Sequence, residues 1–346
     1  MRYLFYITKQ YTPAVIRPLT RLLSREGRDW AVLCSPEMKS FVEEELRPPK
    51  CFLRLDQVID YAPDFVLTPE NRVHHRLPGV KVQLFHGLGV EKKSHFVIRG
   101  FFDVYFTSGP YVTRRFLKMQ RRKKYFKVFE TGWIKIDGIL EGEIEGLRQR
   151  LNIPSDKNIV LYAPTFSRSM QSASKLSQII PKIMKDDEYW LFKFHPIMPK
   201  ELIQPFKEMD PTRALYVTDA DITPYLHLAD VMISDTSSVV YEFYALNKPV
   251  ITFRGIKGIN RAIDVEDEAG LREALDLLLK EPQRQLDVIS EVMGEINPYL
   301  DGSIARRTLE ALDAIDPGEF PHKRKPKNLM RKRKFEKQTK KLGIDG

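Results

Sequence analysis

The feature that most constrains the fold is an alternation of strand-like and helix-like stretches, which runs through the first half of the chain and then starts again. In the first half, the expected strands are residues 2–7, 30–34, 65–67, 80–85, 104–106 and 128–129, and the expected helices include residues 13–25 and 36–46. Strands that alternate with helices are typical of a parallel sheet covered on both faces.

The second half repeats this pattern. Its expected strands are residues 159–163, 189–195, 215–217, 231–233 and 250–253, and its expected helices are residues 175–185, 199–208, 222–228, 237–246, 271–280 and 286–293. A charged helix near residues 141–151 is expected at the crossing between the halves. We therefore predict an α/β fold of two Rossmann-like lobes with parallel sheets and a cleft between them, at residues 1–150 and 151–320.

Length and composition agree with a globular chain of two domains. The 346 residues are enough for two domains of roughly 100–200 residues, and 42% of them are hydrophobic and 29% charged. The only cysteines are Cys34 and Cys51, which form no Cys-x-x-Cys pair, so neither a disulfide framework nor a zinc site is expected. No apolar run reaches 18 residues, and the apolar run at the N-terminus is too short for a signal peptide. We therefore expect a cytoplasmic protein, at most peripheral to the inner face of the cell membrane.

The net charge of +10 is concentrated at the C-terminus. Residues 322–342 hold eleven Lys and Arg against one Glu, so the rest of the chain is balanced and is not expected to bind nucleic acid. A block of like charge is usually disordered, and we expect residues 321–346 to form a disordered tail. Residues 323–341 are candidates for contact with an anionic membrane surface. Nucleic acid, an anionic polymer and a purely solubilising role are the alternatives.

The most informative segment follows the expected strand at residues 231–233, which leads into Ser234-Asp235-Thr236-Ser237-Ser238 and then a helix. We predict that this polar turn holds a diphosphate, because the free backbone N–H groups of a helix start and the serine hydroxyls donate to anions. The alternative is that Asp235 and the serines only cap the helix. Glu242, on the same helix, is a candidate acceptor for ribose or polyol hydroxyls, and a solvated Glu is its alternative.

Two other expected strands end in histidine. The strand at residues 80–85 leads into His86, Gly87 and Gly89. An imidazole at such a position can remove a proton from a hydroxyl near neutral pH, and glycines let the backbone approach a ligand closely. The strand at residues 189–195 ends in His195, two residues after Lys193. A structural turn is the alternative for His86, and a solvated side chain is the favoured interpretation of Lys193.

The strand at residues 159–163 opens into a loop that contains Thr165 and Arg168. A hydroxyl and a guanidinium suit phosphate contact, although an ordinary surface loop explains them equally well. Asp219-Ala220-Asp221 matches a D-x-D metal motif, but helix capping accounts for it, and no metal site is predicted. Four other histidines are expected to be structural, namely His74, His75, His95 and His227.

These motifs, in this order, resemble those of the CDP-glycerol glycerophosphotransferase family of teichoic-acid polymerases and primases, which has a GT-B fold. The matching residues are His86-Gly87, Ala163-Pro164-Thr165-Phe166, His195-Pro196, Asp235-Thr236-Ser237-Ser238 and Lys248-Pro249, within residues 82–253. Three features depart from the family pattern. Phe85 stands where the family has Trp, Thr236 stands where it has Tyr, and a Gly- and Pro-rich segment is not evident in residues 254–268.

The resemblance implies that His86 is the general base, and that His195, Ser237 and Ser238 bind the donor pyrophosphate. It implies transfer of glycerol phosphate, or a similar polyol phosphate, from a CDP-linked donor to an acceptor hydroxyl, with release of CMP and no cofactor. The acceptor would be a glycan, a lipid-linked glycan or a polyol-phosphate polymer of the cell surface. Residues 1–150 would form the acceptor lobe and residues 151–320 the nucleotide-donor lobe.

Two other functions remain open. The run at residues 234–238, with Glu242 and Lys248-Pro249, also resembles the donor lobe of UDP-sugar 2-epimerases and related glycosyltransferases. A non-catalytic adaptor on a membrane or nucleic acid is the other alternative, against which the two candidate histidines argue. Both enzyme hypotheses require that His86 and the serine turn reach the same ligand.

Overall fold

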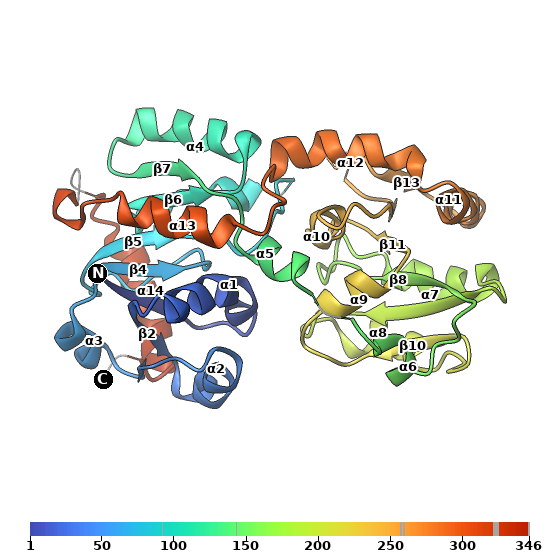
Figure 1. The fold of residues 1–346 in the computed structure, drawn as a ribbon, viewed down its shortest axis with the longest axis horizontal. Helices are drawn as coiled ribbons and strands as arrows, with labels where there is room; N and C mark the ends of the chain where they lie inside the picture. The colour runs from blue at the N-terminus through green and yellow to red at the C-terminus, as the bar shows by residue number, and fades with distance from the viewer. Residues whose placement is uncertain (92, 143, 257, 259, 321–324, 345–346) are drawn as a thin grey trace. The chain divides into compact units, whose positions relative to one another are not determined.

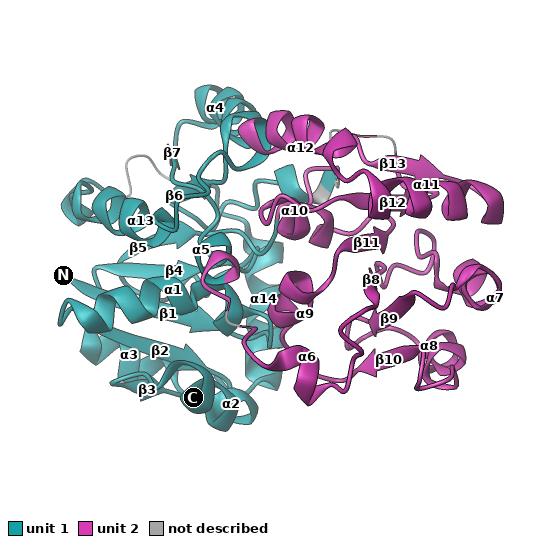
Figure 2. Ribbon diagram, turned by 45° about the vertical axis from the view of Figure 1, so that its right-hand side comes forward, with its two compact units in different colours: residues 1–87, 93–138, 295–346 teal, residues 88–92, 139–294 magenta. Residues whose placement is uncertain are grey.

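The computed structural model describes residues 1–346 except 92, 143, 257, 259, 321–324 and 345–346. The chain forms two compact α/β units, shown in separate colours in Figure 2. Unit 1 contains residues 1–87, 93–138 and 295–346, and unit 2 contains residues 88–92 and 139–294. The division therefore falls near residue 138 rather than 150, and the C-terminal segment belongs to unit 1 instead of ending the second lobe.

Unit 1 is built on a seven-stranded parallel sheet with the strand order β3-β2-β1-β4-β5-β6-β7. Its strands are β1 (Arg2–Ile7), β2 (Asp29–Cys34), β3 (Cys51–Phe52), β4 (Phe65–Thr68), β5 (Val80–Gln83), β6 (Val104–Thr107) and β7 (Lys127–Glu130). The order reverses between β1 and β4. In sheets of this kind, ligands bind beyond the carboxyl ends of the strands at the point of reversal.

The helices of unit 1 come from both ends of the sequence. They are α1 (Thr12–Arg25), η1 (Pro36–Met38), α2 (Lys39–Leu46), α3 (Leu55–Tyr61), η2 (Lys93–Phe96), α4 (Pro110–Lys123), α13 (Ile304–Asp313), η3 (Pro317–Glu319) and α14 (Leu329–Lys341). Helices α1 and α13 are in contact and lie side by side in Figure 1. Two helices, α5 (Lys135–Leu140) and α12 (Gln283–Ile296), run across the division between the units.

Unit 2 is built on a six-stranded parallel sheet with the order β10-β9-β8-β11-β12-β13, which reverses between β8 and β11. Its strands are β8 (Asn158–Tyr162), β9 (Glu188–Lys193), β10 (Ala214–Val217), β11 (Val231–Ser234), β12 (Val250–Phe253) and β13 (Ile263–Val265). Its helices are α6 (Leu147–Arg150), α7 (Ala173–Ile183), α8 (Lys200–Lys207), α9 (Thr223–Leu228), α10 (Val239–Tyr244) and α11 (Glu268–Lys280).

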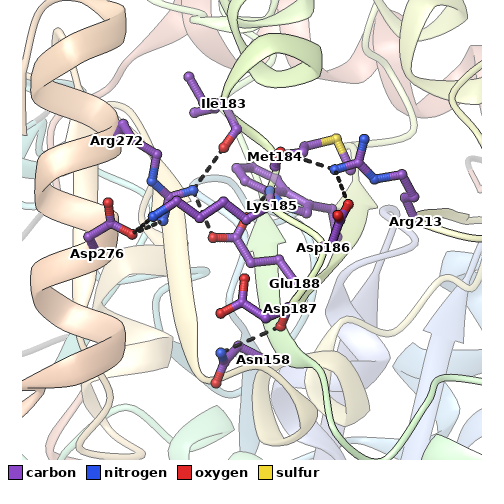
Figure 3. A network of polar contacts seen from close by, with 11 residues as sticks. Asn158, Ile183, Met184, Lys185, Asp186, Asp187, Glu188, Arg213, Arg272 and Asp276 are labelled. Atoms are coloured by element: carbon purple, nitrogen blue, oxygen red, sulfur yellow. Dashed lines mark hydrogen bonds and ion pairs between the residues drawn. The ribbon is translucent and has the colours of Figure 1, made fainter.

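One face of the unit 2 sheet packs on α7, α8 and α11. Leu176, Phe206 and Leu275 from these helices lie in one apolar cluster with Trp190 and Ile233 of the strands. Figure 3 shows a polar network that joins α11 to the segment at residues 183–188, beside this cluster. The Arg272 guanidinium lies 2.7 Å from the Glu188 carboxylate and donates to the Ile183 carbonyl oxygen at 2.9 Å. The helix is therefore held by a buried ion pair as well as by its apolar face.

Two segments differ from what the sequence predicts. Near residues 141–151 only the four residues of α6 are helical, because Gly146 takes a left-handed conformation with φ of 67° just before them; residue 143 of the expected helix lies outside the described residues. The basic tail was expected to be disordered, yet residues 329–341 form α14. Phe335 is buried on this helix and packs against Phe101, which anchors it to unit 1.

Of the helices that the structure describes, none is both long and apolar enough to span a membrane.

Candidate functional site

In unit 1, a strained residue precedes His86. Phe85 follows β5 with φ of 58°, a left-handed conformation that costs an L-residue roughly 1–2 kcal/mol. The Phe85 ring is held by His95 and Phe116 at centroid distances of 4.9 and 5.2 Å, and its carbonyl oxygen accepts from Trp133 Nε1 at 3.1 Å. Because the aromatic packing fixes this turn, the His86 side chain is presented at the surface.

A buried carboxylate lies at the reversal point of the same sheet. Glu70, two residues beyond β4, accepts hydrogen bonds from the Thr8 backbone N–H and hydroxyl, both at 2.6 Å. Burial raises the pKa of Glu70. Tyr11, in the turn after β1, has its ring 5.8 Å from that of His86. Sequence reasoning missed Glu70, and its position just after a buried strand at the reversal was the available signal.

In unit 2, Asp235 joins two of the predicted motifs. It follows β11 directly, is 1% exposed, and accepts from the Thr165 backbone N–H at 2.8 Å. Its other oxygen accepts from the backbone N–H and hydroxyl of Ser172, at 2.9 and 2.8 Å. The structure thus brings the loop after β8 and the turn after β11 together at the reversal point, and it gives Asp235 a positioning role there.

The rest of the turn after β11 divides into buried and half-buried residues. Thr236 is buried, and its hydroxyl accepts from the Ile256 backbone N–H at 3.2 Å. Ser237 and Ser238 are half-buried, and neither hydroxyl has a polar partner among the residues that the structure describes. Helix capping by these serines is therefore not what the structure shows. Glu242 is 7% exposed, which removes the alternative of a solvated side chain.

His195 lies beside the loop that carries Thr165. Its ring is 4.4 Å from the ring of Phe166, and both side chains are exposed. His195 Nδ1 accepts from the Ile197 backbone N–H at 3.3 Å, which places the proton of a neutral ring on Nε2 and makes Nε2 a donor. Arg168 is exposed on the same loop, and Thr165 is buried.

Three other charged residues of the motifs lie in unit 2. Lys193 is 8% exposed rather than solvated, and burial lowers its pKa against the attraction of Asp219 and Asp221. Asp221 accepts from the backbone N–H of Thr223, the first residue of α9, at 2.9 Å, although the cap position of this helix is Ile222. Lys248 donates to carbonyl oxygens at the end of α9, at 3.2 Å for Leu226, and burial lowers its pKa to about 8.

The two units hold different parts of the predicted site. His86 and Gly87 belong to unit 1, whereas Gly89 and the candidates from residue 165 to residue 242 belong to unit 2. Within unit 2, the structure places Thr165, Asp235 and His195 on neighbouring loops at one edge of the sheet.

Two doubly wound parallel sheets define a GT-B-type α/β fold, and solved structures agree. The wall teichoic acid polymerase TagF matches with a TM-score of 0.66 and 16% identity over 90% of this chain and 89% of the other. A putative UDP-N-acetylglucosamine 2-epimerase from Listeria monocytogenes gives 0.65 and 16% over 94% and 98%. The predicted GT-B fold is thus confirmed, but such similar scores do not separate a transferase from an epimerase.

The comparisons of sequence give matches to transferases. The model of the CDP-glycerol:poly(glycerophosphate) glycerophosphotransferase family matches residues 86–255, so this part of the chain is similar to that family. A teichoic acid glycerol-phosphate primase of Bacillus spizizenii is 35% identical over 111 residues, which are 31% of this chain and 28% of the relative. A teichoic acid glycerol-phosphate transferase of Staphylococcus aureus is 26% identical over 144 residues, 37% of this chain and 35% of the relative. The chain thus spans about a third of the length of these relatives.

Proposed function

We propose that this chain transfers glycerol phosphate, or a similar polyol phosphate, from a CDP-linked donor to an acceptor hydroxyl of a cell-surface glycan or polyol-phosphate polymer, and releases CMP. The observation that carries the proposal is the family match, which begins at His86 and encloses every matched motif up to Lys248-Pro249. TagF, which shares the fold, has been soaked with CDPG, and this supports a cytidine nucleotide as the donor.

In the proposed reaction, the exposed His86 takes the proton from the acceptor hydroxyl. The hydroxyl oxygen forms a bond to the β-phosphorus, and the bond from that phosphorus to the oxygen of CMP breaks. His195 Nε2 donates to the charge that develops on the departing phosphate. The reaction requires both histidines to act in one complex of donor and acceptor, and no covalent intermediate is needed.

The placement of the side chains in unit 2 supports the proposed donor-binding roles. Ser237 and Ser238 offer hydroxyl donors to the diphosphate, with Arg168 as an exposed cation and Thr165 and Thr236 lining the turns. Glu242 accepts from ribose or polyol hydroxyls. Asp235 holds the two loops in register, and Gly87 and Gly89 let the backbone approach the donor.

The test is release of CMP from CDP-glycerol by the purified protein, with UDP-N-acetylglucosamine supplied separately. We expect CMP with the first and neither UDP nor an epimer with the second. His86→Ala should lower kcat by about 10²–10⁴-fold, the usual contribution of a general base, with little change in donor binding.

A paired substitution tests the donor turn. Ser237→Ala with Ser238→Ala should raise the donor KM, whereas Ser174→Ala, an exposed serine of α7, should leave it unchanged. UDP release or epimerisation would replace the proposal with the epimerase alternative, and full activity in His86→Ala would remove the base.

A second part of the proposal concerns α14 and the residues before it. We infer contact of residues 323–341 with an anionic membrane surface, of which residues 323 and 324 lie outside the described residues. Leu329 and Met330 are 61% and 87% exposed beside the cations of α14, a combination that suits the interfacial region of a bilayer. Leu329→Glu with Met330→Glu should abolish cosedimentation with anionic vesicles, and unchanged cosedimentation would refute the contact.

A further inference from the structure

A cavity of about 240 Å³ is lined by residues of unit 1, none of which is assigned to the donor. Its walls are Arg72, Val97, Arg99, Phe101, Arg331 and Lys334. The four cations come from three separate parts of the chain, namely the loop after β4, the segment between η2 and β6, and helix α14. Folding therefore gathers positive charge here from positions more than 200 residues apart.

Three of the four cations donate hydrogen bonds to uncharged oxygen atoms. Arg99 donates to the Val97 carbonyl oxygen at 3.2 Å, Arg331 to the Arg99 carbonyl oxygen at 3.4 Å, and Arg72 to Gln338 Oε1 at 3.4 Å. Over the described part of the chain, no carboxylate forms an ion pair with any of the four. Burial and then the positive charge of Arg72 lower the pKa of Arg99, as expected when like charges face one another.

Two basic side chains near the cavity, unlike the four that line it, lie beside carboxylates. Lys325, just before α14, lies 2.7 Å from the carboxylate of Asp103, which is 3% exposed. Glu336, the one acidic residue of α14, lies 3.3 Å from His75. The fold thus places carboxylates beside the cavity but none within it, although paired charges would relieve the repulsion. Convergent cations without a counter-charge, in a concave wall, are the usual arrangement for binding an anion.

The geometry points to a binding site for a phosphate-ester anion in this cavity, with Arg72, Arg99, Arg331 and Lys334 donating to its oxygens. Guanidinium groups match pairs of phosphate oxygens, and Val97 and Phe101 provide an apolar wall for a short carbon chain. The volume is that of about eight waters at roughly 30 Å³ each, which fits a polyol phosphate better than a nucleotide. The ester has two sources, a soluble polyol phosphate and the headgroup of an anionic lipid.

The test uses the full chain and two matched double variants of α14. Arg331→Gln with Lys334→Gln removes two charges from the cavity, and Lys337→Gln with Lys340→Gln removes two exposed charges from the same helix. The soluble probe is sn-glycerol 3-phosphate, measured by calorimetric titration at low salt. The lipid probe is a phosphatidylglycerol vesicle, with phosphatidylcholine vesicles for comparison.

We expect the cavity variant to weaken binding of at least one probe by about tenfold or more, which corresponds to about 1.4 kcal/mol. The control variant should stay within about twofold of the wild type for sn-glycerol 3-phosphate. For the vesicles it should lose less than the cavity variant, because its lysines belong to the proposed membrane contact. The probe that responds identifies the source of the ester. Equal losses in both variants, or no binding of either probe to the wild type, would overturn the site. CMP binding is measured in parallel, because its loss would speak against the proposed function and not against this site.

Discussion

Two carboxylates serve the same structural purpose in the two units. Asp235 and Glu70 both follow the strand beyond the reversal point, and each accepts a backbone N–H from a threonine that follows the first strand of its unit. In both cases a buried carboxyl group joins two loops that are more than 60 residues apart in the sequence. The sequence allowed Asp235 to be singled out as a polar residue after a strand, but no spacing rule identifies its partners.

Asp235→Asn is predicted to loosen the loop that carries Thr165. The amide nitrogen would face an N–H donor in place of one acceptor oxygen, and hydrogen bonds to a buried charged group contribute roughly 1.5–3 kcal/mol each. We expect the free energy of unfolding to fall by about 2 kcal/mol and the donor KM to rise. Urea denaturation and CMP-release kinetics measure both. Asp210→Asn is the control, because Asp210 accepts from the Thr212 backbone N–H at an exposed turn; equal effects of the two changes would contradict the assignment.

His95 should give unit 1 a dependence on pH. Burial, followed by the nearby His86 and Arg115, lowers the pKa of His95 to about 3, whereas an unfolded histidine titrates near 6.5. Between these values the unfolded chain binds the extra proton, so stability is fully present above pH 6.5 and falls as the pH decreases. In the wild type, the free energy of unfolding should fall by about 2 kcal/mol from pH 7 to pH 5, measured by urea denaturation at both values. In His95→Phe this fall should be absent. The same loss in the variant would show that other groups cause it.

Among the elements, buried strands were the most predictable. The second-half strands at residues 159–163, 231–233 and 250–253 agree with β8, β11 and β12 to within a residue at each end, because long apolar runs have few other placements. The edge strands β3 and β13 were missed. They have two and three residues and bury little, so their pairing depends on the sheet rather than on their own sequence.

Arg272 offers a test of how α11 is held on unit 2. Figure 3 shows its guanidinium paired with the Glu188 carboxylate. The Glu188 side chain is 1% exposed. Arg272→Leu would leave that carboxylate buried without its counter-charge, which costs about 3–5 kcal/mol. Arg284→Leu is the matched control, since its pair with Glu281 is exposed and contributes at most about 1 kcal/mol. Thermal and urea unfolding compare the two, and similar losses would mean that the buried pair is not what holds the helix.

At the scale of the whole molecule, the return of the chain to unit 1 is the feature that sequence reasoning did not supply. The sequence predicted that residues 151–320 form one lobe. A sequence pattern shows where a helix lies along the chain, but it does not show which of the two sheets that helix packs on. Three hydrogen bonds join the late segment to residues 133–137 of unit 1. The Asp137 carboxylate accepts from the backbone N–H groups of Ile304 and Ala305 at 3.0 and 2.7 Å, and Asn297 Oδ1 accepts from the Trp133 N–H at 2.7 Å.

This arrangement predicts which part of the structure a core mutation in the last helices will destabilise. Leu312 of α13 is fully buried in unit 1, so Leu312→Ala should cost about 2–5 kcal/mol and increase hydrogen exchange in α1 and β1, close to 300 residues earlier. Leu275→Ala in α11 creates a similar cavity in unit 2 and should act on β8 to β13 instead. If Leu312→Ala loosened residues 151–294 and left α1 protected, the last helices would belong with the second sheet, as the linear division at residue 150 implied.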